Sequence, residues 1–214
     1  MRGEWLRKPS SETSVIFVHG ILSSGETAWR NSSTGSSWPR LLVDDTAADG
    51  YGVYVFTYQT DIFSGSYSLG DVVDAIKEHL RLDRVLESRR LIFVCHSMGG
   101  LAVRKYLVDR FADLTERGIA VGLYLVASPS LGSRYADWLE PLARLMGHAQ
   151  ADALRFVENN LWLADLDKNF KNLRDGGRLQ IVGKELVEDK FVVLKRFLRT
   201  QVVAAFSGAV YFGE

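Results

Sequence analysis

The chain has 214 residues, enough for one large domain or at most two small ones, and a domain of that size buries roughly 70% of the surface of its unfolded chain. Hydrophobic residues make up 47% and charged residues 24%, which is typical of a globular protein and excludes a disordered one. The 26 Lys and Arg balance the 26 Asp and Glu, and this zero net charge argues against a nucleic-acid partner. One cysteine excludes an internal disulfide framework, and four histidines leave few candidates for acid–base catalysis.

Short apolar runs alternate with helical patterns along the chain, as in βα units that build a mostly parallel sheet. The runs are continuous rather than alternating, which is typical of strands covered by helices on both faces. The predicted strands are 15–18, 53–58, 91–95, 121–127 and 179–182, with 209–212 as a further candidate.

Between the strands, apolar residues recur at three- and four-residue spacing, which predicts helices. One helix is expected over 69–86, after a capping box formed by Ser68 and Asp71, and a second over about 99–114. Residues 135–172 are helical in pattern and rich in Leu and Trp. We expect this segment to be a helical cap inserted over the sheet.

The strongest motif is LIFVCHSMGGLAV at residues 91–103, a buried strand followed by a sharp turn at Ser97 and a helix opened by glycines. This is the context of a nucleophile elbow, in which a strained turn projects the serine hydroxyl above the sheet edge. Residues two positions away must be small. Gly99 meets this requirement, and Cys95 departs from the usual glycine but is also small. The alternative is that Ser97 merely caps the helix.

A second motif, VIFVHGILSSG at residues 15–25, is a strand that ends in His-Gly and leads into a loop. Backbone N–H groups of such a loop supply one half of an oxyanion hole, and the residue after the nucleophile supplies the other. The expected donors are the N–H groups of Met98 and Ile21, with Leu22 as the next loop candidate.

In their order and spacing the two motifs resemble the α/β-hydrolase superfamily. Within it, HGILSSGETAW and VCHSMGGLAVRKYL are most similar to lipase-type serine esterases of the SERAC/PGAP1 group. The phrase LVASPSLGS at 125–133 adds to the resemblance, with Ser130 where relatives often carry histidine. The resemblance covers about residues 14–135. It implies an α/β-hydrolase fold, with a mostly parallel central sheet and helices on both faces, as one domain over 1–214.

The superfamily orders its triad as Ser, then Asp or Glu, then His. The acid is therefore expected at the end of the strand that follows the cap, where Glu185, Glu188 and Asp189 are candidates. The resemblance favours Glu185, because similar esterases carry a glutamate just past this strand. The alternative is that these charges belong to a solvated loop.

No histidine follows Glu185. His19 belongs to the expected oxyanion loop, where relatives hold it for structure, and the elbow points His96 away from the serine. His79 is expected to be exposed on its helix. His148 could reach the site from the cap, but it precedes every candidate acid.

Three explanations for the missing base stay open. The first is truncation of the chain, with the catalytic histidine beyond Glu214. The second is a non-catalytic hydrolase-like module, and the third is a relocated base such as His148. The chain ends directly after a strand-like run with no closing helix, which favours truncation.

The sequence thus predicts an esterase- or lipase-like serine hydrolase of carboxylic esters, with thioesterase or amidase chemistry as alternatives on the same scaffold. The expected substrate is a small-molecule or lipid ester, without a metal or organic cofactor. Contact of the apolar cap with a membrane surface is a hypothesis. We expect a cytoplasmic protein, because the first residues lack the apolar segment of a secretory signal and no apolar stretch is long enough to span a bilayer.

Overall fold

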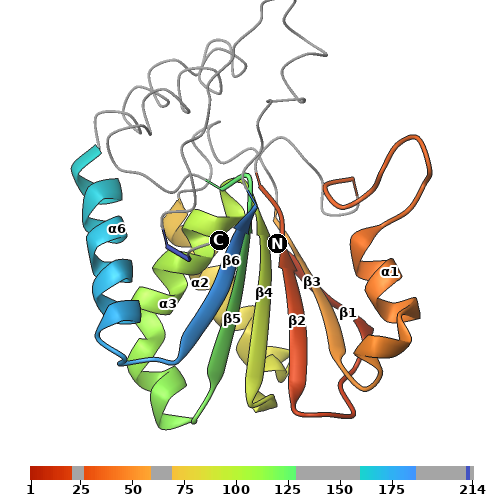
Figure 1. Cartoon of the computed structure of the whole chain (residues 1–214), viewed down its shortest axis with the longest axis horizontal. Coiled ribbons are helices and arrows are strands. Elements are labelled where there is room, and N and C mark those ends of the chain that lie inside the picture. Colours follow the sequence, from red (N-terminus) through yellow and green to blue (C-terminus); the bar gives the residue numbers. More distant parts are fainter. Residues whose placement is uncertain (21–26, 59–68, 129–159, 187–210, 213–214) are drawn as a thin grey trace, which may run out of the picture.

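The computed structural model describes residues 1–20, 27–58, 69–128, 160–186 and 211–212, and these ranges form a six-stranded sheet with helices on both faces (Figure 1). The strand order is β1-β3-β2-β4-β5-β6, in which β1 pairs antiparallel with β3 and the other pairings are parallel. The strands are β1 (Arg2–Arg7), β2 (Thr13–Val18), β3 (Gly52–Thr57), β4 (Arg90–His96), β5 (Ala120–Val126) and β6 (Ile181–Leu186). The predicted, mostly parallel sheet is confirmed.

The helices form two layers around this sheet. One face is covered by α1 (Trp38–Asp44), and the other by α2 (Leu69–Leu82), α3 (Gly99–Glu116) and α6 (Asn160–Asp175) (Figure 1). The helix predicted over 99–114 is confirmed as α3. The helix predicted over 69–86 ends earlier, because Arg84 adopts a left-handed conformation with φ 61° and a short 3-10 turn, η3 (Val85–Glu87), follows. A second 3-10 turn, η1 (Thr46–Ala48), precedes β3.

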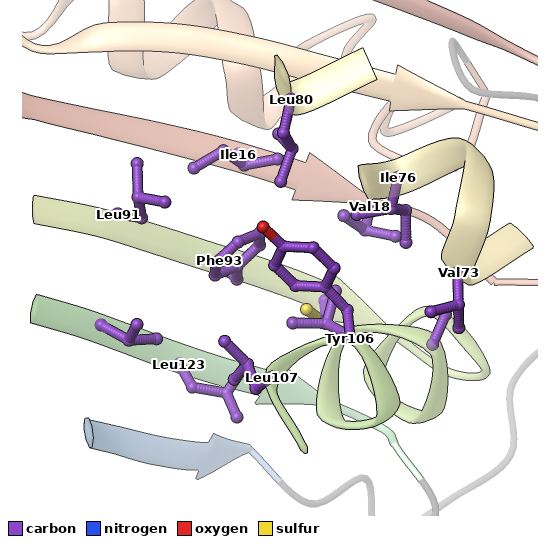
Figure 2. Packing of buried hydrophobic residues seen from close by; sticks show 14 of the residues in the cluster. Ile16, Val18, Val73, Ile76, Leu80, Leu91, Phe93, Tyr106, Leu107 and Leu123 are labelled. Atoms are coloured by element: carbon purple, nitrogen blue, oxygen red, sulfur yellow. The ribbon is translucent and has the colours of Figure 1, made fainter. Parts of the chain in front are cut away.

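The larger hydrophobic core lies between the sheet and the layer of α2 and α3. Leu91, Phe93 and Cys95 alternate along β4 onto this face and are fully buried. The ring of Tyr106 on α3 lies 6.1 Å from that of Phe93, between the helix and the sheet (Figure 2). All six residues of β2 are buried. This confirms that the continuous apolar run marks a strand covered on both faces.

The edge strand β1 was not predicted. Its sequence, RGEWLR, carries charges, as edge strands often do. Long-range polar contacts hold it to the sheet: the indole N–H of Trp5 donates to the carbonyl of Asp83 at 3.0 Å, and the guanidinium of Arg7 donates to three backbone carbonyls within residues 43–51. A local pattern cannot reveal contacts of this kind.

The strand predicted over 179–182 is instead β6, Ile181–Leu186. Gly183, Lys184 and Glu185 have low intrinsic strand propensity, but each pairs in register with a residue of β5, and this pairing overrides propensity. Glu185 therefore lies inside the strand, near its carboxyl end, rather than past it.

Two predicted elements fall largely on residues that the structure does not describe. Of the candidate strand 209–212, only Tyr211 and Phe212 are described, and they form a bend rather than a strand. Of the predicted cap, residues 135–159 lie outside the described ranges.

Residues 160–172 of the predicted cap belong to α6, which packs against α3 and sends Phe170 and Leu173 into the same core. This part is a flanking helix and not a cap. Apolar spacing shows that a helix has a buried face, but not what covers it. Within the described ranges, no helix is both long and apolar enough to cross a membrane.

Candidate active site

Ser97 lies in the sharp turn between β4 and α3. Its φ angle is 55°, in the left-handed region, where a residue with a side chain is strained by about 1–3 kcal/mol. Its N–H donates to the carbonyl of Val126 on the neighbouring strand β5 at 2.9 Å, which holds the turn against the sheet. The geometry predicted for a nucleophile elbow is therefore present at Ser97.

Gly99 and Cys95, the residues two positions from Ser97, have different surroundings. A Cβ atom at Gly99 would lie 2.4 Å from the carbonyl oxygen of Val18 and 2.6 Å from that of His19, so glycine is needed for α3 to approach β2 this closely. Cys95 is fully buried in the core beneath α3, and burial raises the pKa of its thiol. The side chain that replaces the usual glycine is accommodated as a small core residue.

Gly20 brings the chain that follows β2 directly against the serine. A Cβ atom at Gly20 would lie 2.5 Å from Ser97 Cβ and 2.8 Å from Ser97 Oγ, closer than non-bonded atoms approach. The loop after β2 therefore begins beside the serine hydroxyl. Ile21, the expected loop donor of the oxyanion hole, and Leu22, its alternative, lie outside the described residues.

Met98 carries the other expected oxyanion donor. It is the N-cap residue of α3 and its side chain is buried. Within the described part of the chain no group accepts a hydrogen bond from its N–H, as is usual for the first turn of a helix. This N–H, next to Ser97 and at the positive end of the helix dipole, can stabilise an anion that forms at the serine.

A second serine, which the sequence analysis did not single out, supports the elbow. The Ser128 hydroxyl donates to the carbonyl oxygen of Ser97 at 2.8 Å. A Cβ atom at Gly100 would lie 2.3 Å from Ser128 Oγ, so this glycine leaves the space that the hydroxyl fills. The available signal was the position of Ser128 directly after a strand, within the phrase LVASPSLGS. Ser130, which the resemblance highlighted, lies outside the described residues.

His19 is buried and both its ring nitrogens are engaged. Its Nδ1–H donates to the carbonyl of Gly20 at 2.7 Å, and its Nε2 accepts the N–H of Tyr58 at 3.1 Å. The Tyr58 ring stacks on it at 4.4 Å, and the Tyr58 hydroxyl donates to the His19 carbonyl at 2.7 Å. Burial lowers the pKa of His19, although its hydrogen bond to Gly20 opposes this. A neutral imidazole held in this way has a structural role, in agreement with expectation.

The other described histidines also make their contacts away from the Ser97 hydroxyl. His96 packs edge-to-face against Trp29 at 6.2 Å, and burial lowers its pKa. His79 was expected to be exposed, but its side chain is 28% exposed, 5.7 Å from the Phe56 ring and 3.6 Å from Asp83. The expectation failed because the helix turns this residue partly toward β3.

No histidine of the described ranges hydrogen-bonds the Ser97 hydroxyl. His148 lies outside them. Among the described residues, no three His, Cys, Asp or Glu side chains gather in a group that could hold a metal ion.

Glu185 lies at the carboxyl end of β6, opposite Leu125 of β5. Two strand spacings separate β6 from β4, which places Glu185 about 10 Å from β4, the strand that Ser97 directly follows. One of its carboxylate oxygens, Oε2, accepts the backbone N–H of Tyr211 at 2.9 Å. Glu188 and Asp189, the other candidate acids, lie outside the described residues.

Comparison with known proteins identifies the family. A model of the alpha/beta hydrolase family matches residues 15–207. Protein SERAC1 of Danio rerio is 22% identical over 228 residues, which cover 94% of this chain and 34% of that protein. The chain thus spans about a third of the length of this curated relative.

Two solved lipase structures are also similar. Lipase BlEst2 of Bacillus licheniformis, in its mature form, aligns with a TM-score of 0.49 and 16% identity over 88% of this chain and 72% of that one. A monoacylglycerol lipase of Paleococcus ferrophilus aligns with a TM-score of 0.45 and 16% identity over 89% of this chain and 79% of that one. Since the family model spans most of the sheet, the elbow and β6, the chain belongs to the alpha/beta hydrolase family.

Proposed function

We propose that this protein is an esterase- or lipase-like serine hydrolase of carboxylic esters and that Ser97 is its nucleophile. The observation that carries the proposal is the environment of Ser97: a left-handed turn at the N-terminus of α3, with Gly20 packed against its Oγ. Membership of the alpha/beta hydrolase family supports the same class of reaction. The substrate we propose is a small-molecule or lipid ester.

In the proposed reaction, Ser97 Oγ attacks the ester carbonyl carbon while its proton passes to a histidine. The negative charge on the carbonyl oxygen is stabilised by the N–H groups of Met98 and Ile21. The bond from carbon to the leaving alcohol then breaks, and the histidine returns its proton to that alcohol. Water, activated by the same histidine, cleaves the acyl-serine and releases the carboxylic acid.

The base we propose is a histidine beyond Glu214, oriented by Glu185. The position of Glu185 at the carboxyl end of β6 supports this role, because the carboxyl ends of parallel strands meet at the edge that carries Ser97. His148 is the alternative base within the chain.

A second candidate function is a hydrolase-like module that binds without turnover. It is favoured by one observation, that no histidine of the described ranges hydrogen-bonds the Ser97 hydroxyl. Without a base, serine is a weak nucleophile at neutral pH. Thioester or amide hydrolysis is a further alternative, because the same constellation serves several leaving groups.

Reaction with a fluorophosphonate probe separates these functions. The natural protein that contains this chain should be labelled at Ser97, and Ser97→Ala should abolish the labelling. A matched set of substrates with one acyl group on oxygen, sulfur or nitrogen then identifies the leaving group. A folded protein whose serine is inert to the probe would leave only the binding module.

A further inference from the structure

Arg104 is a charged residue that is fully buried, on α3 one turn after Gly100. A buried charge costs several kcal/mol unless it is paired and hydrogen-bonded. Here the guanidinium lies 3.5 Å from Asp167 on α6, and its Nε–H donates to the carbonyl of Gly100 at 3.3 Å. An ion pair therefore joins α6 to the helix that begins at the nucleophile.

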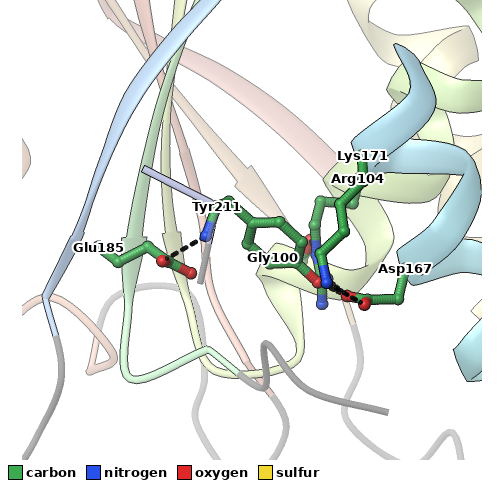
Figure 3. Close-up of polar contacts among 6 residues, drawn as sticks. All are labelled: Gly100, Arg104, Asp167, Lys171, Glu185 and Tyr211. Carbon is green, nitrogen blue, oxygen red and sulfur yellow. Dashed lines mark hydrogen bonds and ion pairs between the residues drawn. The ribbon is translucent and has the colours of Figure 1, made fainter. Parts of the chain in front are cut away.

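The Tyr211 hydroxyl bridges the two partners of this ion pair. Arg104 Nη1–H donates to the Tyr211 hydroxyl oxygen, and the hydroxyl proton is donated to Asp167 Oδ1 (Figure 3). The guanidinium also lies over the Tyr211 ring, 4.7 Å from its centre, while Lys171 lies 2.9 Å from the other oxygen of Asp167. The edge-to-face contact with Phe170, at 5.1 Å, further restricts the ring.

The backbone of Tyr211 contacts β6, whereas its side chain contacts α3 and α6. Its N–H donates to Glu185 Oε2 at 2.9 Å (Figure 3). The next residue, Phe212, is equally confined, because a Cβ atom at Gly183 of β6 would lie 2.6 Å from its ring. Residues 211–212 are thus held by their side chains while a backbone N–H holds the carboxylate of Glu185.

We propose that Tyr211, held by the buried Arg104–Asp167 pair, is a positioning residue for the carboxylate of Glu185. The inference rests on the proposed function, in which Glu185 is the triad acid. A triad carboxylate acts by orienting the imidazole and stabilising its protonated form, so a small displacement is costly. Because Arg104 lies on α3, the helix that begins two residues after Ser97, the network links the proposed acid to the proposed nucleophile.

The competing role is mechanical, in which the network fastens residues 211–212 to the sheet and affects stability alone. Tyr211→Phe distinguishes the two, since it removes only the hydroxyl and keeps both the ring and the backbone N–H. Lys105→Gln is the matched control, because Lys105 is the neighbour of Arg104 on α3 and pairs with Asp109 at the surface. The measurements are ester hydrolysis and fluorophosphonate titration of reactive Ser97 in the natural protein.

The fluorophosphonate titration gives the concentration of molecules whose Ser97 is reactive, and kcat is calculated per reactive serine. For Tyr211→Phe we expect this kcat to fall about 10-fold with little change in KM. A well-placed carboxylate raises the pKa of a histidine, so its displacement should shift the acid limb of the kcat/KM profile to lower pH, by about half a unit. In a Glu185→Gln background, Tyr211→Phe should change kcat less than about 2-fold, because its target is already gone. Lys105→Gln should match the wild type throughout.

Arg104→Lys provides an independent second variant, because lysine cannot reproduce the fork of donors that the guanidinium offers. It should shift the acid limb in the same direction as Tyr211→Phe. An unshifted acid limb with unchanged kcat per titrated serine, accompanied only by a lower Tm, would overturn the inference. An effect of Tyr211→Phe that is equally large in the wild type and in the Glu185→Gln background would also overturn it. An unreactive serine in the wild-type protein would instead reject the proposed function.

Discussion

Gly20 and Ser97 are in contact at the carboxyl ends of neighbouring parallel strands. A Cβ atom at Gly20 would lie 2.5 Å from Ser97 Cβ. The contact follows from the register of β2 and β4, in which Val18 lies opposite Cys95, so the residues two positions beyond this pair meet at one edge of the sheet. The two motifs, which are far apart in the sequence, are therefore parts of a single site.

Gly20→Ala tests this contact. The added methyl group must displace either the serine side chain or the start of the loop, because Ser97 Oγ would lie 2.8 Å away. We expect the rate of reaction with a fluorophosphonate to fall about 100-fold or more, and the free energy of unfolding to fall by about 1–3 kcal/mol. Labelling kinetics and denaturant unfolding measure the two effects.

Gly177→Ala is the control for that variant. It also replaces a glycine, at φ 61°, but no atom of the described residues lies within 4 Å of the new methyl group. We expect a stability loss of about 1 kcal/mol from the backbone strain and no change in labelling. If Gly20→Ala were labelled at the wild-type rate, the arrangement of Gly20 and Ser97 would be wrong.

Ser97→Gly should stabilise the fold while it removes the hydroxyl of the proposed nucleophile. Glycine adopts a φ of 55° without steric cost, whereas Ser97→Ala keeps the strain. After allowing for the greater freedom of glycine in the unfolded chain, we expect a gain of about 1 kcal/mol over Ser97→Ala. Thermal and denaturant unfolding of the two variants measure it.

Arg84→Gly is the matched comparison outside the site. Arg84 also has a left-handed backbone, with φ 61°, and its ion pair with Glu87 is exposed and therefore contributes little. The free energy of unfolding of Arg84→Gly should rise above that of the wild type by a similar amount. The variant should react with the fluorophosphonate probe at the wild-type rate. A Ser97→Gly variant no more stable than Ser97→Ala would show that the elbow holds no strain.

His19 and His96 should make stability depend on pH near neutrality. Burial lowers the pKa of His96, and the nearby His19 lowers it further; burial also lowers the pKa of His19. The unfolded chain therefore binds protons more readily than the folded one. Stability is fully present above the unfolded pKa of about 6.5 and is lost as the pH falls below it.

His96→Phe should make this dependence shallower, because one of the two groups no longer titrates. It should cost little stability at pH 7.5, since Nδ1 of His96 is buried without a hydrogen-bond partner among the described residues. Denaturant unfolding between about pH 5.5 and 7.5, a range that spans the unfolded pKa, provides the test. Parallel curves for wild type and His96→Phe would contradict the expected contribution of His96.

Cys95 offers a probe of the elbow strand. Its thiol is fully buried and burial raises its pKa, so the reactive thiolate is scarce in the folded protein. We expect a thiol reagent to modify Cys95 only through unfolded molecules, at a rate that rises with denaturant in parallel with unfolding. Fast modification of the native protein would mean that β4 opens locally, which the packing of this strand argues against.

The elbow could be predicted from sequence because its geometry depends on residues close to Ser97 along the chain. The strand before it and the glycines after it are sufficient to place a strained turn at Ser97. The same is true of Gly20, which follows a strand closely. A geometry that depends only on neighbouring residues can be predicted from a short segment of the sequence.

The remainder of the site depends on contacts between distant residues. Arg104 and Tyr211 are 107 residues apart, and neither carries a local signal that it will be buried against the other. Glu185 was expected past a strand but lies inside β6, since pairing with β5 extends the strand through residues of low propensity. The edge strand β1 was missed for a related reason, because distant carbonyls bind its Arg7.

Whether Ser97 is an activated nucleophile is tested most directly by chemical labelling. The natural protein is treated with a fluorophosphonate and the adduct is located by peptide mass spectrometry, with Ser97→Ala as the control. We expect one adduct, on Ser97, that forms faster as the pH rises through the pKa of the base. A folded protein that forms no adduct, or one whose adduct persists in Ser97→Ala, would contradict the proposed role of Ser97.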